Sequence, residues 1–200
     1  MNHISTVLFD LGNVLAYIDF RAFWHDLGFS RAEEMIPYVE GYTSLTKQYE
    51  TGFISTDSYL NGLHTVFNQQ FTPQRIEQAF ACIIQKPVEG MEDIVQRVSR
   101  THQTALVSNT NEIHYRLSLT KFEQLKILQK HYLSYQLRVM KPARGFYDAI
   151  IKDQRIFPSE MLFVDDIAEN VKAAKSAGMQ AIRFESTGQL ETDLQNLGIL

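Results

Sequence analysis

The pattern of apolar positions divides the chain into three stretches. Residues 5–9 (STVLF) form a short apolar run with β-branched and aromatic residues, and Gly12 follows soon after, so we predict a buried strand that ends in a loop. Over residues 20–84 the apolar residues recur at helical spacing, and no strand pattern interrupts them. After Pro87, helical and strand patterns alternate to the end of the chain.

The helical stretch contains two recognisable helix starts. In ISTDSYLNGLHTVF (residues 54–67), Ser55 is the predicted N-cap, and the apolar residues that follow are spaced along one helix face. In FTPQRIEQAF (residues 71–80), Thr72 is the predicted N-cap and Pro73 takes the first helical position, where its missing N–H is not needed. Both segments are therefore predicted helices with one buried face.

The alternating stretch predicts a parallel sheet. An apolar helical stripe precedes TALVSNT (residues 104–110) and consists of Met91, Ile94, Val95 and Val98. The later predicted elements are a strand at 131–137, a helix at 144–153, a strand at 161–166, a helix at 168–178 and a strand at 179–184. Residues 112–130 have helical spacing without clear ends. Strands that alternate with helices indicate an α/β fold with a doubly wound parallel sheet, into which the helical stretch is inserted.

Composition and charge narrow the range of partners. With 200 residues, of which 44% are hydrophobic, the chain can bury a substantial core. The net charge of -4 and the lack of a Lys/Arg-rich run argue against nucleic acid, and no apolar run approaches the roughly 18 residues that span a bilayer. We expect neither a nucleic acid nor a membrane partner, and a cytoplasmic location. The single cysteine, Cys82, lies in an apolar helical pattern and is expected to be a buried, inert thiol.

Polar residues follow the predicted strands at the points where parallel strands end. They are Asp10 after the first strand, Ser108 after the second, Lys141 just beyond the third, and Asp165 with Asp166 after the fourth. Ligands of open parallel sheets bind at the carboxyl ends of the strands, so these side chains are expected to converge on one crevice. Three carboxylates at one place would repel one another unless a cation lay among them, and their oxygen atoms suit Mg²⁺.

The same residues could hold a phosphoryl group. Mg²⁺ and Lys141 would offset its charge, Ser108 would donate a hydrogen bond, and Asp10 could attack phosphorus. Taken singly, each residue has an ordinary structural explanation, because aspartates cap helices, Ser108 and Asn109 are common turn residues, and acids suit a helix N-terminus. We favour one shared site because the residues all follow strands of one sheet.

With these residues the chain resembles the haloacid dehalogenase-like hydrolase superfamily, in which phosphatases that form an aspartyl-phosphate predominate. The segments FDLGNVL, LVSNTN, KP and FVDDIAEN resemble its four motifs, in the right order and each after a predicted strand. The helical stretch resembles the C1-type cap, which implies a core of residues 1–19 and 85–200 and a cap of residues 20–84. Among the branches of the superfamily, the pattern is similar to that of bacterial sugar-phosphate phosphatases resembling α-glucose-1-phosphatase.

The resemblance assigns a role to each matching residue. It implies that Asp10 is the nucleophile and a metal ligand, that the main-chain carbonyl of Gly12 and the carboxylate of Asp166 complete the set of protein ligands, and that Asp165 acts through a metal-bound water. It further implies that Ser108 and the Asn109 amide hold the phosphoryl oxygens, that Lys141 bridges phosphate and nucleophile, and that Asn170 supports the loop after Asp166.

One position departs from the family pattern. Family phosphatases usually carry a second aspartate two residues after the nucleophile, which protonates the leaving group and later activates water, and here that position is Gly12. General acid–base help contributes about 10² to 10⁴ in rate, so we expect slow turnover or a preference for good leaving groups such as anomeric phosphates. We hypothesise that Asp19 or an ordered water supplies part of the missing function.

Three functions follow from these residues. The leading one is a Mg²⁺-dependent phosphatase acting on a small phosphorylated metabolite, such as a sugar phosphate, under the cap. A haloacid dehalogenase, in which Asp10 attacks carbon, ranks lower because paired Asp165 and Asp166 suit a metal that such chemistry does not require. A binding module or sensor for phosphate ligands is the third, because the acid is missing at Gly12. The sequence leaves the physiological substrate and the oligomeric state open.

Overall fold

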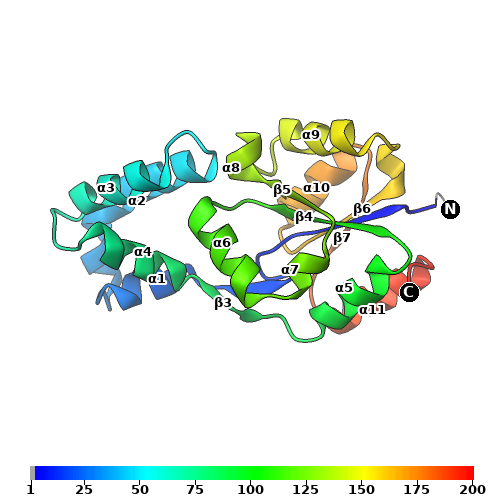
Figure 1. Ribbon diagram of the computed structural model, residues 1–200, viewed down its shortest axis with the longest axis horizontal. Helices are drawn as coiled ribbons and strands as arrows, with labels where there is room; N and C mark the ends of the chain where they lie inside the picture. Colours follow the sequence, from blue (N-terminus) through cyan, green and yellow to red (C-terminus); the bar gives the residue numbers. More distant parts are fainter. Residues whose placement is uncertain (1–2) are drawn as a thin grey trace.

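The computed structural model describes residues 3–200 as two connected units, which Figure 1 shows side by side along the long axis of the molecule. The sheet unit is built on β1 (Thr6–Phe9), β4 (Gln103–Ser108), β5 (Lys130–Leu133), β6 (Met161–Asp165) and β7 (Gln180–Arg183). Neighbouring strands are all parallel, in the order β5-β4-β1-β6-β7. The predicted parallel sheet of an α/β fold is confirmed.

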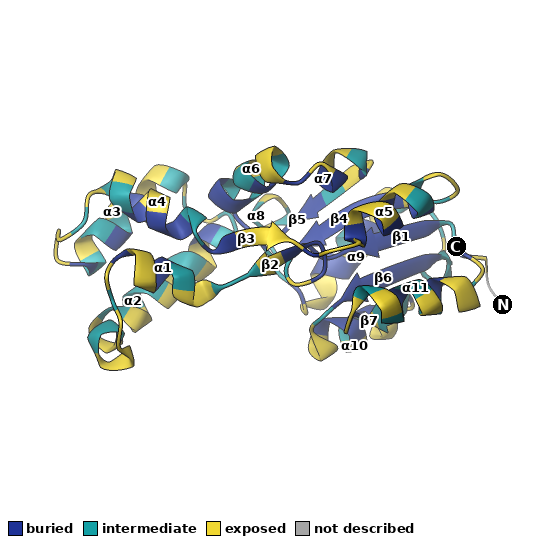
Figure 2. Ribbon diagram, turned by 90° about the horizontal axis from the view of Figure 1, so that it is seen from below, coloured by how far each residue is buried: buried dark blue, intermediate teal, exposed yellow. Residues whose placement is uncertain are grey.

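Helices cover both faces of this sheet because side chains alternate along its strands. Val7 and Phe9 of β1 belong to the apolar core on one face, and Leu8 belongs to the core on the other. The first face is covered by α5 (Met91–Ser99), α6 (Glu112–Lys121), α7 (Gln124–Ile127) and α11 (Thr187–Asn196). The second face is covered by α9 (Arg144–Gln154) and α10 (Ala168–Ser176). The central strands are accordingly buried throughout (Figure 2).

The helical unit has its own apolar core. It consists of α1 (Phe20–Asp26), α2 (Ala32–Glu50), α3 (Thr56–Val66) and α4 (Pro73–Ala81). Aromatic side chains fill its centre, with Phe23, Phe67 and Phe80 each at most 1% exposed. Ser55 and Thr72 cap α3 and α4 as predicted, since each side-chain oxygen accepts a main-chain N–H three residues on.

A short antiparallel ribbon that we did not predict joins the two units. It pairs β2 (Ala16–Ile18) with β3 (Ile84–Pro87). The chain therefore leaves and re-enters the sheet unit through two adjacent strands, at the two ends of the inserted helical stretch. The residues of β3 after Ile84 are exposed, so they lack the apolar pattern that marks a buried strand.

A second connection holds the units together away from the ribbon. The end of α2 reaches the short helix α8 (Ser134–Leu137), where Ser134 Oγ donates to the carbonyl of Glu50 at 2.7 Å. Nearby, Thr56 Oγ1 donates to a carboxylate oxygen of Glu112 at 2.6 Å. Figure 1 shows the end of α2 beside α8. The helical unit is thus fixed to the sheet unit at two separated points.

Three sequence predictions need correction. The predicted strand 131–137 is β5 only as far as Leu133, after which one helical turn, α8, turns the chain back. The segment 112–130 forms two helices instead of one, because Phe122 adopts an extended conformation and lies in the core. Cys82 follows the end of α4 and is partly exposed, so it is not the buried helical residue that we expected.

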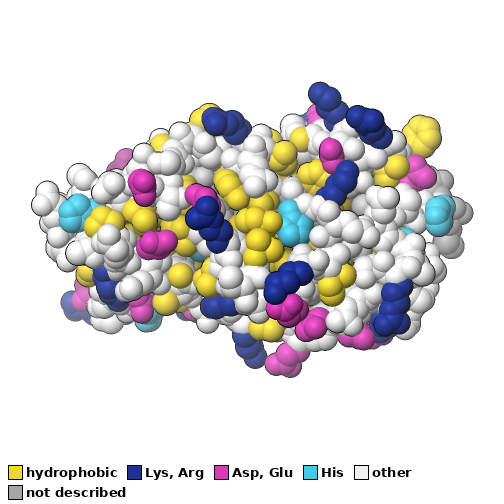
Figure 3. Space-filling view, in the orientation of Figure 1, with side chains coloured by type: hydrophobic (Ala, Val, Ile, Leu, Met, Phe, Trp, Pro, Cys, Tyr) yellow, Lys and Arg dark blue, Asp and Glu magenta, His cyan; other side chains and the backbone are white. Residues whose placement is uncertain are grey.

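Charged and apolar side chains are unevenly distributed on the face of the molecule that Figure 3 shows. Figure 3 shows basic side chains scattered among acidic ones on one face, with apolar side chains at the surface where the helical and sheet units meet. Within residues 3–200, none of the helices combines the length and the apolar character needed to cross a membrane.

Candidate active site

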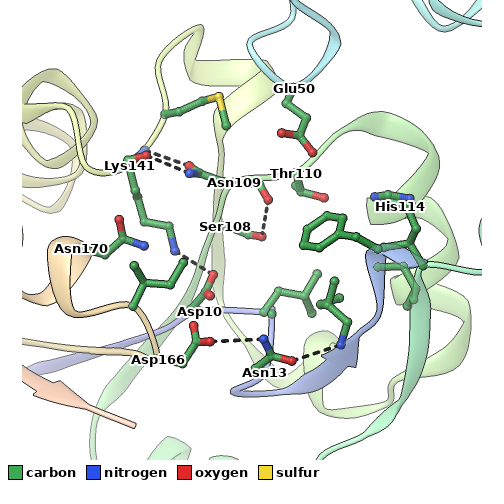
Figure 4. Close-up of a pocket in the computed structure, with 18 residues that line it drawn as sticks. Asp10, Asn13, Glu50, Ser108, Asn109, Thr110, His114, Lys141, Asp166 and Asn170 are labelled. Carbon is green, nitrogen blue, oxygen red and sulfur yellow. Dashed lines mark hydrogen bonds and ion pairs between the residues drawn. The ribbon is translucent and has the colours of Figure 1, made fainter. Parts of the chain in front are cut away.

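The predicted polar residues meet at the carboxyl end of the sheet. Asp10 follows β1, Ser108 ends β4, Asp165 ends β6, and the chain after α8 brings in Lys141. Figure 4 shows Asp10, Ser108, Lys141 and Asp166 around one cavity. This cavity has a volume of about 260 Å³. Its walls come from both units, since residues of α1, α2 and the β2–β3 ribbon line it together with the strand ends.

Lys141 is the centre of the charge arrangement. Its Nζ lies 2.7 Å from Asp10 Oδ1, 2.7 Å from Asp165 Oδ2 and 3.1 Å from the carbonyl of Val107, so its three N–H groups each have an acceptor. The Lys141 side chain is 1% exposed and that of Asp165 is fully buried. One buried ammonium group therefore holds two carboxylates in place.

The buried charges shift one another's proton affinities. Burial raises the pKa of Asp10 to about 7, with Lys141 opposing the rise and the charge of Asp165 adding to it. Burial acts to lower the pKa of Lys141, but the charges of Asp10 and Asp165 outweigh burial and raise it. The ammonium group of Lys141 therefore stays protonated. The carboxylates of Asp10 and Asp165 together carry more negative charge than this one ammonium group neutralises.

The donor set fits a hard divalent cation. Asp10, Asp165 and Asp166 each offer a carboxylate oxygen, and these oxygens all lie within 4.8 Å of one another. Burial raises the pKa of Asp166, and the charge of Asp165 raises it further against a hydrogen bond from Asn13. Three carboxylates face only one ammonium group, so a cation with oxygen ligands, such as Mg²⁺, would relieve the repulsion.

Asp165 and Asp166 differ in how many protein donors they already hold. Asp165 Oδ1 accepts from the main-chain N–H of Ile167 at 2.8 Å, and Asn170 Nδ2 lies 3.0 and 3.1 Å from its two oxygens. Asp166 Oδ2 accepts one hydrogen bond, from Asn13 Nδ2 at 3.2 Å, and its side chain is half-buried at the cavity. Asp166 is therefore the freer candidate metal ligand, and Asn170 supports Asp165.

Ser108 and Asn109 both line the cavity. The hydroxyl of Ser108, which is 2% exposed, lies 3.4 Å from the carbonyl oxygen of Asn109. The side-chain amide of Asn109 forms a reciprocal pair with the main chain of Lys141, at 2.9 Å through Nδ2 and 2.8 Å through Oδ1. This side chain positions the lysine loop, so a phosphoryl contact from Asn109 would have to come from its main-chain N–H.

The structure places Gly12 beside Asp10 and Asp19 at the start of α1, outside the cavity. A Cβ atom at Gly12 would lie 3.8 Å from Asp10 Oδ2 and 3.3 Å from Ile18 Cγ1, so a side chain there would stand beside the nucleophile candidate. Asp19 instead caps α1, where its carboxylate accepts from the main-chain N–H of Arg21 at 2.9 Å. Asp19 does not line the cavity, and the hypothesis of its help in proton transfer gains no geometric support.

Sequence reasoning missed several residues of the cavity. Asn13, adjacent to Gly12, contacts Asp166, and Thr110 follows the Ser108–Asn109 pair in the wall. Glu50 and His114 line the side of the cavity nearer the helical unit. An acid as the last residue of a helix is unfavourable, and that was the one sequence signal that could have drawn attention to Glu50.

Comparisons with known proteins agree with this geometry. Residues 4–178 match the haloacid dehalogenase-like hydrolase family. A D-ribitol-5-phosphate phosphatase of Bacteroides thetaiotaomicron is 28% identical to the chain, and the match covers 96% of this chain and 97% of that protein. A structure of a HAD family enzyme from the same organism, in complex with magnesium and inorganic phosphate, is 25% identical with a TM-score of 0.79, covering 92% of this chain and 96% of its own.

A more distant structure has the same fold. The L-2-haloacid dehalogenase of Xanthobacter autotrophicus with covalently bound chloropropionic acid is 16% identical, with a TM-score of 0.65, and covers 98% of this chain and 84% of its own. At that identity the likeness concerns the fold alone. The family match, in contrast, spans most of the chain and includes all four of the motifs whose residues meet at the sheet end. The chain therefore belongs to the haloacid dehalogenase-like hydrolases.

Proposed function

We propose that the protein is a magnesium-dependent phosphatase that hydrolyses a small phosphorylated metabolite, with sugar or polyol phosphates as its substrate class. The observation that carries this proposal is the contact of Lys141 Nζ with Asp10 Oδ1 at 2.7 Å, beside a group of three carboxylates. This arrangement presents a carboxylate nucleophile next to groups that can neutralise a phosphoryl dianion.

In the proposed reaction, one carboxylate oxygen of Asp10 forms a bond to phosphorus as the bond between phosphorus and the ester oxygen breaks. The leaving alkoxide takes a proton from a water molecule, which becomes hydroxide. A second water then gives a proton to that hydroxide and attacks phosphorus as the bond between phosphorus and Asp10 breaks, which releases inorganic phosphate and restores Asp10. Lys141 orients Asp10 and offsets charge on the phosphoryl oxygens, while Ser108 donates a hydrogen bond to one of them.

Magnesium would be held by the carboxylates of Asp10 and Asp166 and the main-chain carbonyl of Gly12. When bound, it would neutralise charge on the phosphoryl group and orient it toward Asp10. Asp165 would act through a water on the metal, because its own oxygens already accept hydrogen bonds from Lys141, Ile167 and Asn170.

The substrate class follows from the size of the cavity and from a relative. A cavity of about 260 Å³ beneath the helical unit suits a small metabolite better than a phosphoprotein loop. The relative that matches nearly the whole chain is a D-ribitol-5-phosphate phosphatase, which supports sugar or polyol phosphates. The lack of a carboxyl side chain at Gly12 favours good leaving groups over poor ones, by a factor of about 10² to 10⁴.

Phosphate release by purified protein tests the proposal. Sugar phosphates, polyol phosphates, nucleotides and p-nitrophenyl phosphate are compared with and without Mg²⁺, for the wild type, Asp10→Asn and Asp19→Asn. We expect Mg²⁺-dependent release that falls on the order of 10⁴-fold in Asp10→Asn, because the nucleophile is lost. Asp19→Asn is the matched control and keeps its turnover, because Asp19 lies outside the cavity.

Three results would contradict the proposal. Unchanged release in Asp10→Asn would exclude this nucleophile. No release by the wild type, together with a phosphorylated ligand that raises its melting temperature, would favour the alternative of a binding module. Release of halide from 2-haloacids without Mg²⁺ would favour the dehalogenase alternative.

A further inference from the structure

Glu50 is an acid of the cavity that the proposed reaction does not use. It is the last residue of α2, and its side chain lines the same cavity as Asp10 and Ser108. Figure 4 shows the carboxyl group of Glu50 pointing into the cavity from the helical unit, with Ser108 between it and Asp10 in that view. Glu50 therefore faces the part of a substrate that lies away from the phosphoryl group.

The position of Glu50 is costly in three ways. Its side chain is half-buried among mainly apolar walls, and burial raises its pKa to about 7 against a hydrogen bond from Asn111. As the last residue of α2 it lies at the negative end of the helix dipole. Within residues 3–200, no Lys, Arg or His forms an ion pair with it. Acids kept at such cost in a cavity mark functional positions.

A buried hydrogen-bond chain fixes the amide that contacts Glu50. The main-chain N–H of His114 donates to Asn111 Oδ1 at 3.0 Å, which identifies the oxygen of that amide. His114 Nε2 lies 2.9 Å from the carbonyl of Phe80 and must carry the hydrogen, since a carbonyl can only accept. Burial lowers the pKa of His114 to about 4, so the ring is neutral and its Nδ1 accepts from Asn111 Nδ2 at 3.1 Å.

The hydrogen-bond chain through His114 and Asn111 occupies only part of the Glu50 carboxyl group. One hydrogen of Asn111 Nδ2 goes to His114, and the second is available to Glu50. Asn111 is fully buried. Among the described residues, Asn111 is the side chain whose hydrogen bond lowers the pKa of Glu50, and the Glu50 side chain lines the cavity.

We propose that Glu50 is a specificity-determining residue that binds a hydroxyl group of the substrate's leaving alcohol, at the end of the cavity away from the phosphoryl group. This inference rests on the proposed phosphatase function and narrows its substrate class to phosphate monoesters with a hydroxyl several bonds from the phosphate. Ile18, Ile83 and Met140 line the same cavity and would pack against the carbon chain between the two polar ends.

A hydroxyl group fits Glu50 better than an ammonium group does. Burial disfavours the charged form of the Glu50 carboxyl group and raises its pKa to about 7. A protonated carboxyl both donates and accepts a hydrogen bond, which matches a hydroxyl but not an ammonium group, which has no acceptor. Loss of the substrate hydroxyl would leave Glu50 without its partner in a poorly solvated place.

Matched substrate pairs test the proposal. Rates with Mg²⁺ are measured for ω-hydroxyalkyl phosphates of three to five carbons, alkyl phosphates of equal length, and ω-aminoalkyl phosphates. The proteins are wild type, Glu50→Gln, Glu50→Leu and, as matched control, Glu40→Gln, which changes an exposed acid of the same helix. p-Nitrophenyl phosphate, which has no such hydroxyl, serves as the reference substrate for all four.

We expect the wild type and Glu40→Gln to prefer the best hydroxyalkyl phosphate over its alkyl partner by about 10- to 100-fold in kcat/KM. Glu50→Leu abolishes this preference and Glu50→Gln reduces it, whereas Glu40→Gln keeps the wild-type kcat for p-nitrophenyl phosphate. A preference that survives in Glu50→Leu, or a wild type that prefers the aminoalkyl or alkyl esters, would overturn the inference. No Mg²⁺-dependent release of p-nitrophenol by the wild type would instead overturn the proposed function.

Discussion

The two ends of the cavity handle charge in opposite ways. At the sheet end, Lys141 lies 2.7 Å from both Asp10 and Asp165, so buried charges are paired and kept. At the helical end, no ion pair among residues 3–200 involves Glu50, and burial favours the neutral forms of Glu50 and His114 through their shifted pKa values. A reaction at phosphorus needs fixed charge, whereas recognition of an uncharged alcohol does not.

The two ends of the cavity also differ in which structural elements position their residues. Asp10, Ser108 and Asp165 lie at strand ends, so the strand order brings them together, and the segment after α8 adds Lys141. The helical-end residues depend on how α2 and α6 are placed against each other, through contacts such as the hydrogen bond from the main-chain N–H of Ile113 to the Tyr49 hydroxyl at 3.2 Å. The positions of the proposed catalytic residues therefore depend on the sheet. The position of Glu50 depends on how the helical unit packs against the sheet unit.

The largest expected effect comes from breaking the charge pairing at the sheet end. Lys141→Met leaves two buried carboxylates without their cation, so we expect a loss of roughly 3–5 kcal/mol in the free energy of unfolding, together with loss of phosphatase activity. Urea denaturation in EDTA, which keeps metal from replacing the lysine, measures the stability. The matched control is Lys130→Met, whose 2.7 Å pair with Asp153 is exposed and should contribute less than about 1 kcal/mol.

The comparison between the two lysines has a clear contrary outcome. Equal losses in Lys141→Met and Lys130→Met would mean that the buried cluster is not held by its ammonium group. The sheet end would then resemble the helical end, with its acids neutralised by protons.

A second, smaller effect comes from the contact that places the helical end. Gly52 has φ of +68° and lies against α8, where an added Cβ would come 2.0 Å from the main-chain oxygen of Tyr135. Gly52→Ala therefore forces the two units apart, and we expect a loss of roughly 2–4 kcal/mol in unfolding free energy from strain and overpacking. The kcat/KM for hydroxyalkyl phosphates falls as well, because Glu50 moves with the end of α2.

Gly28→Ala is the control for the conformational cost of replacing a glycine that has a positive φ. Its φ is +94°, but nothing lies within 4 Å of an added Cβ, so Gly28→Ala carries only the conformational cost of about 1 kcal/mol. Urea denaturation of both variants separates the two causes. Equal losses would show that the contact with Tyr135 does not fix the helical unit, and that the helical end of the cavity is not held in one position.

The sheet end could be predicted from the sequence because its signals are local. Asp10, Ser108 and Asp165 come directly after apolar runs, and parallel strands end at one edge. The partner of Asp165 was not predictable in detail, because the contact of Asn170 with Asp165 depends on how α10 turns away from β6. The spacing still placed Asn170 near the correct loop.

The helical end could not be predicted because its signals are tertiary. Glu50 lies 60 residues or so before His114 and Asn111, and only the folded chain brings them to one cavity. The ribbon of β2 and β3 was missed for a related reason, since the segment IQKP is short and mostly exposed and carries no apolar alternation. From the sequence we suggested a part in proton transfer for Asp19, but in the structure its carboxylate accepts the main-chain N–H of Arg21 and caps α1.

The smallest expected effect concerns the two titratable groups at the helical end. The pKa of Glu50 is raised by burial from 4.5 to about 7, so the folded protein binds this proton more tightly than the unfolded chain, and stability is gained as the pH falls through this range. The pKa of His114 is lowered by burial from 6.5 to about 4, so the unfolded chain binds its proton more tightly, and stability is lost as the pH falls below 6.5.

Between about pH 8 and pH 5, each change amounts to roughly 2 kcal/mol, and the two offset each other in the wild type. Over the same range, Glu50→Gln should therefore lose roughly 2 kcal/mol more than the wild type, and His114→Gln should gain roughly 2 kcal/mol relative to it. Urea denaturation at both pH values in EDTA measures this, and Asp10, which titrates in all three proteins, drops out of the comparison. A uniform loss of stability in either variant leaves the pH dependence unchanged. Equal pH dependence in all three proteins would mean that both groups are solvated, and Glu50 would then be paired with water instead of being held ready for a substrate hydroxyl.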